Sequence, residues 1–153
     1  PSVPSQHFHK YIDGPSTPLY PFGFGLSYTR FAYSSLKLSH TRISDKDSFT
    51  ASIELTNVGD REGTEVVQLY IRDIYSSATR PVKELKDFAR VTLKPGEKKT
   101  VTFTVTPDKL AYWNRNMQYG VEKGVFEIMI GSSSQDKDLK KVKMEATNAF
   151  PLR

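Results

Sequence analysis

The sequence predicts an all-β domain, an antiparallel β-sandwich of about seven short strands. Segments in which apolar and polar residues alternate recur along the chain, and clusters of Gly, Pro, Ser and Asn separate them. Strand side chains point alternately to the two faces of a sheet, so each segment has one face for the core and one for water. The 153 residues form one domain that buries about two thirds of its unfolded surface.

The first clear strand is "SFTASIELTN", in which every second residue from Phe49 to Leu55 is apolar. In "TEVVQLYIRD", Val67, Leu69 and Ile71 share one face, and the opposite face is also apolar enough for a central strand. "KKTVTFTVT" repeats the alternation after "KPGE", whose Pro95 and Gly96 suit the middle of a type II turn.

Two further strands follow a single helical turn, which Thr106 is expected to cap with Pro107 at its first position. "GVFEIMIG" and "KKVKMEAT" both alternate, and the lysines of "KDLKKVK" are expected to protect a terminal edge strand. Weaker strands are expected near Phe31 to Leu38 and Phe88 to Leu93. Together these segments are typical of a sandwich of immunoglobulin or fibronectin type III kind.

Residues 1–29 are rich in Pro, Ser and Gly, and their prolines exclude a helix interior or a central strand. We therefore expect an extended N-terminal arm over residues 1–29, the sandwich over 30–148 and a tail over 149–153.

The charge pattern argues against several partners. Lys and Arg number 22 and Asp and Glu 17, so the net charge is 22 − 17 = +5, with the two signs interspersed. This pattern favours solubility over nucleic-acid binding. We expect no membrane span, because the sequence has no apolar stretch of about 20 residues. We find no signal peptide in this fragment, because "PSVPSQHFHK" lacks the apolar core of one.

No catalytic, metal or cofactor motif is complete. "GLSYT" has Thr29 where a nucleophile elbow needs glycine, so Ser27 is interpreted as structural. His7 and His9 would need a distant third ligand such as His40, so we expect no metal and no cofactor. The acidic residues fall on predicted outward faces or beside turns, and no pair has the spacing of a glycosidase acid and nucleophile: Glu54, Glu65, Asp73, Glu84, Asp87, Glu97, Asp108, Glu122 and Glu127.

The arm contains "YPFGFGLSYTRF", in which large rings alternate with glycines that allow close approach of the backbone. One interpretation is that Tyr20, Phe22, Phe24 and Tyr28 contact a neighbouring domain. The other is that the same rings pack on this domain's own sandwich, because an exposed patch of this size favours aggregation.

Tyr112 and Trp113 form a second aromatic site. They could stack on the sugar rings of an oligosaccharide, with Asn114, Arg115 and Asn116 as hydrogen-bonding neighbours. The simpler interpretation is that one ring belongs to the core and its neighbour is partly exposed, since adjacent strand residues face opposite ways.

Five blocks, "PLYPFGFGLSYTRF", "EVVQLYIRD", "RPVKELKDF", "VTLKPGEKKTVTF" and "VEKGVFEIMIGSSS", occur in this order along nearly the whole chain. Together they resemble the C-terminal fibronectin type III-like domain of family 3 glycoside hydrolases of β-glucosidase or β-xylosidase type. Asp87 departs from the glycine common in that family, and we expect it to adopt the left-handed backbone conformation that aspartate tolerates.

The resemblance implies that this chain is not itself an enzyme, because the family's catalytic residues lie in upstream domains and none matches a position here. It implies a non-catalytic accessory domain that packs on and orients those catalytic domains, in a periplasmic or extracellular protein. The alternative is a carbohydrate-binding or adhesive module that uses surface aromatic residues.

Overall fold

A computed structural model describes residues 23, 25, 27–44, 46–75 and 83–152, and it confirms the predicted all-β sandwich. A single helical turn, α1 (Pro107–Leu110), and a 3-10 turn, η1 (Asp136–Asp138), interrupt the strands. The strands are β1 (Phe31–Tyr33), β2 (Lys37–Leu38), β3 (Arg42–Ile43), β4 (Phe49–Asn57), β5 (Gly63–Asp73), β6 (Glu84–Leu93), β7 (Lys98–Val105), β8 (Tyr112–Trp113), β9 (Tyr119–Val121), β10 (Gly124–Gly131), β11 (Leu139–Ala146) and β12 (Phe150–Pro151).

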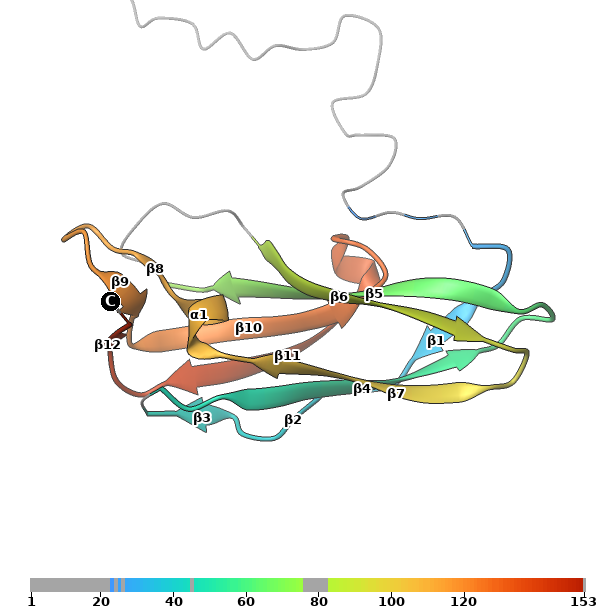
Figure 1. Cartoon of the computed structure of the whole chain (residues 1–153), viewed down its shortest axis with the longest axis horizontal. Helices are drawn as coiled ribbons and strands as arrows, with labels where there is room; N and C mark the ends of the chain where they lie inside the picture. The colour runs from blue at the N-terminus through green and yellow to red at the C-terminus, as the bar shows by residue number, and fades with distance from the viewer. Residues whose placement is uncertain (1–22, 24, 26, 45, 76–82, 153) are drawn as a thin grey trace, which may run out of the picture.

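Two sheets pack face to face to form the sandwich (Figure 1). In the four-stranded sheet, β4 pairs with β1, β2 and β7. The five-stranded sheet has the order β3-β11-β10-β5-β6, which places β5 among its inner strands as predicted. A small third sheet joins β12, β9 and β8 at one end.

The core lies between the two large sheets and consists of the inward residues of their strands. The predicted inward faces are confirmed, because alternate residues of each strand are buried. These residues are Phe49, Ala51, Ile53, Leu55, Val67, Leu69, Ile71, Val101, Phe103, Val105, Phe126, Ile128, Ile130, Met144 and Ala146.

The predicted strand from Phe31 to Leu38 is wrong as one continuous element. The Ser34 hydroxyl accepts a hydrogen bond from the Glu54 backbone N–H at 2.9 Å, while the Ser34 N–H donates to the Glu54 carbonyl at 2.9 Å. The side chain of Ser34 thus replaces a main-chain acceptor. The ladder is interrupted there, and two short strands, β1 and β2, pair with different parts of β4.

Two other expectations need correction. The sheets are not entirely antiparallel, because β3 pairs in parallel with the last two residues of β11, so β11 is an edge only over its earlier part among the described residues. Helix α1 begins after Thr106 with Pro107 at its start, as predicted, but the Thr106 side chain makes no capping hydrogen bond. Pro107 favours the turn without that bond, because the φ angle of proline already suits a helix.

None of the helices in the part of the chain that the structure describes is long and apolar enough to cross a membrane.

Candidate functional site

The residues that lead into β1 cross the outer face of the five-stranded sheet. We call Gly23, Gly25 and Ser27–Arg30 the strap. Gln68, on the outer side of β5, donates hydrogen bonds from Nε2 to the carbonyl of Gly23 at 2.8 Å and to that of Ser132 at 2.9 Å. The Tyr70 hydroxyl donates to Gln68 Oε1, so the amide is held in one orientation. The amide of Gln68 therefore fixes the strap to the sheet.

Gly23 suits this contact because it has no side chain. Its φ angle is +77°, in the left-handed region that favours glycine. A Cβ atom there would lie 2.2 Å from Gln68 Oε1 and 2.7 Å from the Tyr70 hydroxyl. Close approach and backbone conformation both require glycine at this position. Gly25 differs from Gly23, because nothing lies within 4 Å of a Cβ atom added at Gly25.

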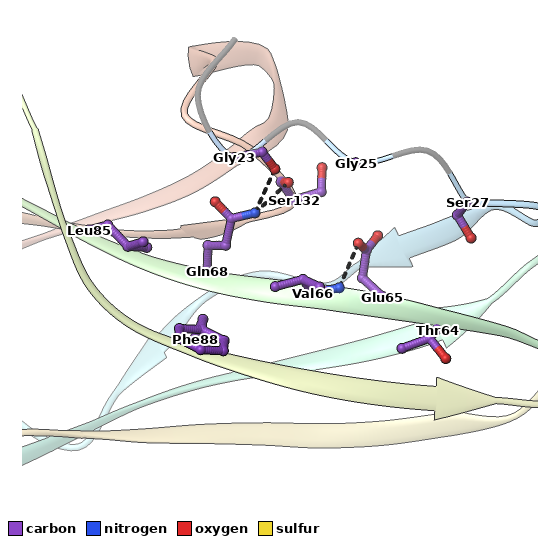
Figure 2. A pocket seen from close by; sticks show the side chains of 10 residues that line it. All are labelled: Gly23, Gly25, Ser27, Thr64, Glu65, Val66, Gln68, Leu85, Phe88 and Ser132. Atoms are coloured by element: carbon purple, nitrogen blue, oxygen red, sulfur yellow. Dashed lines mark hydrogen bonds between the residues drawn. The ribbon is translucent and has the colours of Figure 1, made fainter. Parts of the chain in front are cut away.

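A cavity of about 410 Å³ opens between the strap and the sheet. Figure 2 shows the strap passing above β5, with the side chains of Val66, Leu85 and Phe88 below it. Ser27 and Thr64 contribute hydroxyl groups at its wall. The cavity is thus an apolar groove with a polar margin.

A β-bulge brings two apolar residues of β6, Leu85 and Phe88, to this face. The register between β5 and β6 pairs Leu69 with Asp87 but Tyr70 with Leu85, so Lys86 has no partner opposite it. Without this extra residue, Leu85 and Phe88 would point to opposite faces, because three positions separate them. With it, Phe88 lies opposite Gln68 and Leu85 opposite Tyr70, both on the outer face.

The bulge also explains why the expected left-handed conformation of Asp87 is wrong. Among the described non-glycine residues, only Met117 has a positive φ angle. The extra residue Lys86 accommodates the irregularity of the strand, so no left-handed turn is needed. The Asp87 carboxylate instead accepts a hydrogen bond from Lys109 Nζ at 2.6 Å, which ties β6 to helix α1.

Glu65 is the acidic residue in the wall of the groove, and it is half-buried rather than solvated as predicted. Burial raises the pKa of its carboxyl group, and the hydrogen bond from the Val66 N–H at 2.9 Å lowers it in part. Burial, together with the adjacent Glu65 charge, also raises the pKa of Tyr33. Both groups therefore favour their neutral forms more than they would in water.

The raised pKa of Glu65 predicts a pH-dependent gain from Glu65→Gln. A carboxyl group whose pKa is higher in the folded state destabilises the fold increasingly as pH rises from its unfolded pKa through its folded pKa. Glutamine keeps the acceptor for Val66 without the charge, so we expect a melting temperature a few degrees higher near neutral pH. The gain should vanish at about pH 4, where Glu65 is itself largely neutral.

Thermal melts followed by circular dichroism at the two pH values test this expectation. Glu62→Gln is the control, because Glu62 is exposed and should show no gain. An equal effect of Glu65→Gln at both pH values would contradict the assignment of a buried charge.

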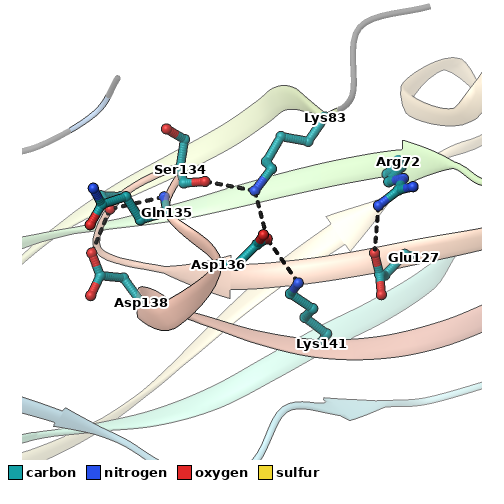
Figure 3. A network of polar contacts seen from close by, with 9 residues as sticks. Arg72, Lys83, Glu127, Ser134, Gln135, Asp136, Asp138 and Lys141 are labelled. Carbon is teal, nitrogen blue, oxygen red and sulfur yellow. Dashed lines mark hydrogen bonds and ion pairs between the residues drawn. The ribbon is translucent and has the colours of Figure 1, made fainter. Parts of the chain in front are cut away.

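The loop between β10 and β11 closes one end of the groove, and a charged network holds it (Figure 3). Lys83 Nζ donates to the Ser134 carbonyl at 2.7 Å and to Asp136 Oδ1 at 2.9 Å. Lys141 Nζ binds the same carboxylate oxygen at 2.9 Å. The hydrogen bond from Lys141, which has the largest effect, and that from Lys83 lower the pKa of Asp136 to about 2. Asp136 therefore stays charged across the physiological range.

Asn57 connects the other end of the strap to the core. It is fully buried, and both its side-chain oxygen and its side-chain nitrogen have hydrogen-bond partners. Its Oδ1 accepts from the Thr29 hydroxyl at 2.9 Å and from the Gly59 N–H at 3.0 Å. Its Nδ2 donates to the carbonyls of Arg61 at 2.8 Å and Leu93 at 2.9 Å. One side chain thus links the strap, the β4–β5 turn and the end of β6.

The residues predicted for interdomain contact are only partly described. Tyr20, Phe22 and Phe24 lie outside the described residues, as do His7 and His9 of the rejected metal site. Tyr28 is described, and 89% of it is exposed to solvent. Its exposure leaves the ring available to a neighbouring surface, so its role stays a prediction.

The second aromatic site lies on the small sheet. Trp113 is 57% exposed, and its ring centroid lies 5.4 Å from that of Tyr119 with the planes tilted by 49°. Tyr112, its neighbour on β8, is half-buried. The stacking partner of Trp113 is therefore Tyr119, which the sequence did not single out.

The described residues contain no group of three or more His, Cys, Asp or Glu side chains that could hold a metal ion. Ser27 lies at the margin of the groove, where its hydroxyl accepts from the Thr29 N–H at 3.4 Å. Glu65 is the acid that the groove contains among the described residues.

Sequence reasoning missed the residues that build this site, namely Gln68, Tyr70 and Asn57. A signal was present for Gln68, because a lone amide within the apolar run "VVQLYI" needs partners when it is buried. Asn57 stands before a turn, where asparagine is common for local reasons, so its long-range bonds leave no pattern in the sequence.

The fibronectin type III-like domain family model matches residues 65–134. A periplasmic β-glucosidase of Salmonella typhimurium is 46% identical over 134 residues, which are 88% of this chain and 18% of that protein. A β-xylosidase of Formosa agariphila is 51% identical over 128 residues, which are 84% of this chain and 18% of that protein.

Solved structures agree with these relatives. A β-glucosidase from Listeria innocua, crystallised with glucose, superimposes with a TM-score of 0.82 at 34% identity. The match covers 94% of this chain and 20% of that one. The chain therefore spans about a fifth of the length of the proteins it matches.

Proposed function

Because residues 65–134 belong to the fibronectin type III-like domain family, we propose that this chain is the non-catalytic accessory domain of a family 3 glycoside hydrolase. In this proposal the whole polypeptide hydrolyses terminal β-glycosidic bonds, and the chain packs on its catalytic domains and orients them. The protein acts in the periplasm or outside the cell, like the periplasmic relative.

The proposal rests on two facts: the chain matches only a small part of each glycosidase, and its groove lacks the pair of acids that glycoside hydrolysis needs among the described residues. Matches cover most of this chain but only about a fifth of proteins named as β-glucosidases and β-xylosidases. Glycoside hydrolysis needs two carboxyl groups roughly 5 to 9.5 Å apart around the sugar. The groove described above contains Glu65 as its acid, and Tyr33 beside it favours the neutral form. The groove therefore supports a role in domain packing rather than in hydrolysis.

Hydrolysis of aryl β-glucosides and aryl β-xylosides tests the proposal. We expect the full polypeptide to hydrolyse at least one of them and the isolated chain to match the buffer rate. We also expect the domain to melt at a higher temperature within the polypeptide than alone, since a partner that binds the folded state stabilises it. Hydrolysis by the isolated chain would refute the accessory role.

The exposed Trp113 favours one alternative, a carbohydrate-binding module. A tryptophan paired with Tyr119 and 57% exposed offers an aromatic surface to a sugar ring. Because the chain has a single tryptophan, its fluorescence reports directly on this site. A saturable change with soluble β-linked oligosaccharides would support this alternative over a purely structural role.

A further inference from the structure

The two outer faces of the sandwich differ in chemistry. The outward residues of β4 are Thr50, Ser52, Glu54 and Thr56, and those of β7 that lie beside them are mostly threonines. None of the exposed large hydrophobic residues among the described ones lies on β4 or β7. The four-stranded sheet thus presents a polar face that is suited to water.

The outer face of the five-stranded sheet carries an apolar patch at β5 and β6. Phe88 is 60% exposed and Leu85 39% exposed, and the β-bulge places them side by side. Beside them on the same side of the sheet lies a second apolar cluster, Tyr70, Met129 and Leu139, which is separate from the main core and buried within this chain. The exposed Phe88 and Leu85 thus extend an apolar area that begins at this cluster.

The strap lies on the same outer face as this apolar patch. Gln68 fixes the Gly23 carbonyl on this outer face, and Asn57 fixes Thr29 at its edge. The described residues before β1 therefore lie on this face rather than on the face of β4 and β7. The relatives extend about five times the length of this chain, so a large region would be available to cover it.

From these observations we propose that the outer face of the five-stranded sheet, centred on Phe88 and Leu85 beside the strap, is the docking surface for the catalytic region of the same polypeptide. This inference rests on the proposed function and adds the face and the residues that make the contact. The partner surface has an apolar centre that covers Phe88 and fills the groove.

Charged side chains beside the apolar patch of this chain indicate which charges the partner surface carries. Arg90 lies opposite Val66 across β5 and β6, and Arg72 lies two residues beyond Tyr70 on β5. Basic side chains thus flank the apolar centre at both ends. Glu127 pairs with Arg72 at a distance of 4.0 Å, while 45% of the Arg72 side chain is exposed. The docked surface is therefore expected to carry acidic groups around its apolar centre.

The test compares Phe88→Ser with Trp113→Ser, which removes an aromatic residue of similar exposure from a different sheet. Each change is made in the isolated chain and in the full polypeptide. In the isolated chain we expect both to shift the melting temperature by no more than about 2 °C, because both residues are exposed. In the full polypeptide we expect Phe88→Ser to lower the melting temperature of this domain by at least about 4 °C more than it does in isolation.

The possible outcomes separate the two claims. If the wild-type domain melts higher in the polypeptide but Phe88→Ser has the same effect in both contexts, this docking face is wrong and the accessory role stands. If the wild-type domain melts at the same temperature in both contexts, domain packing itself is refuted. A shift caused by Trp113→Ser alone would place the docking surface on the small sheet.

Discussion

Replacing Asn57 with alanine is expected to lower the free energy of unfolding by about 3 kcal/mol. The change removes four hydrogen bonds made by a fully buried side chain: those to Thr29, Gly59, Arg61 and Leu93. Each of these main-chain and hydroxyl groups then loses a partner, and a buried polar group without a partner costs about 1 to 3 kcal/mol. Urea denaturation at constant pH gives the change directly.

Asn148→Ala is the matched control, because Asn148 is exposed and makes a single hydrogen bond, to the Ser44 carbonyl at 3.0 Å. We expect it to change the free energy of unfolding by less than about 0.5 kcal/mol. Asn57→Asp adds a further check, since its carboxylate would face the carbonyls of Arg61 and Leu93. Its loss of stability should exceed that of the control and decrease at acid pH. Equal stability of the Asn57→Ala and Asn148→Ala variants would refute the role given to Asn57.

Gly23→Ala is expected to detach the strap from the sheet and to lower the free energy of unfolding by about 1 to 3 kcal/mol. Alanine is strained at a φ of +77°, and its Cβ would overlap Gln68 Oε1 at 2.2 Å. The Gln68 amide then loses the Gly23 carbonyl as an acceptor. Urea denaturation measures the stability, and limited proteolysis near residue 23 measures exposure of the strap.

Gly25→Ala is the control, because nothing lies within 4 Å of the added Cβ. It should leave both stability and the rate of cleavage near their wild-type values. If the two alanine variants are cleaved at the same rate, the strap is not held by Gln68 and Gly23.

The strands could be predicted because their determinants are local. In β4, β7 and β10 each inward residue is two positions from the next, so burial follows directly from the period of the sequence. The turn at Pro95 and Gly96 was equally clear, and Gly96 has the positive φ of 76° that a type II turn requires. Both depend only on neighbouring residues.

The site could not be predicted because its determinants are distant in the sequence. The outer position of Leu85 depends on the bulge at Lys86, which arises in the pairing with β5 and leaves no mark on β6 alone. The break in the strand predicted from Phe31 to Leu38 depends on the hydrogen bond that the Ser34 hydroxyl accepts from the Glu54 N–H, 20 residues later. Predictions from alternating residues assume a regular ladder of main-chain hydrogen bonds. The extra residue at Lys86 and the Ser34 hydroxyl each interrupt that ladder.

The two interpretations of the aromatic segment concern its rings, and of these the structure describes Tyr28. Gly23 contacts this domain's own sheet through its carbonyl and Gln68, a main-chain contact that neither interpretation addressed. Tyr28 remains 89% exposed, as contact with a neighbouring domain would require. The close fit of Gly23 and the exposure of Tyr28 are compatible with a segment placed between two surfaces.

Hydroxyl-radical footprinting of the isolated chain and of the full polypeptide tests most directly whether this domain docks through its five-stranded sheet. In isolation, Phe88, Tyr28 and Trp113 should all be oxidised, because each is more than half exposed. In the full polypeptide we predict strong protection of Phe88 and Tyr28, with Trp113 still reactive. Equal oxidation of Phe88 in the two samples would contradict the account.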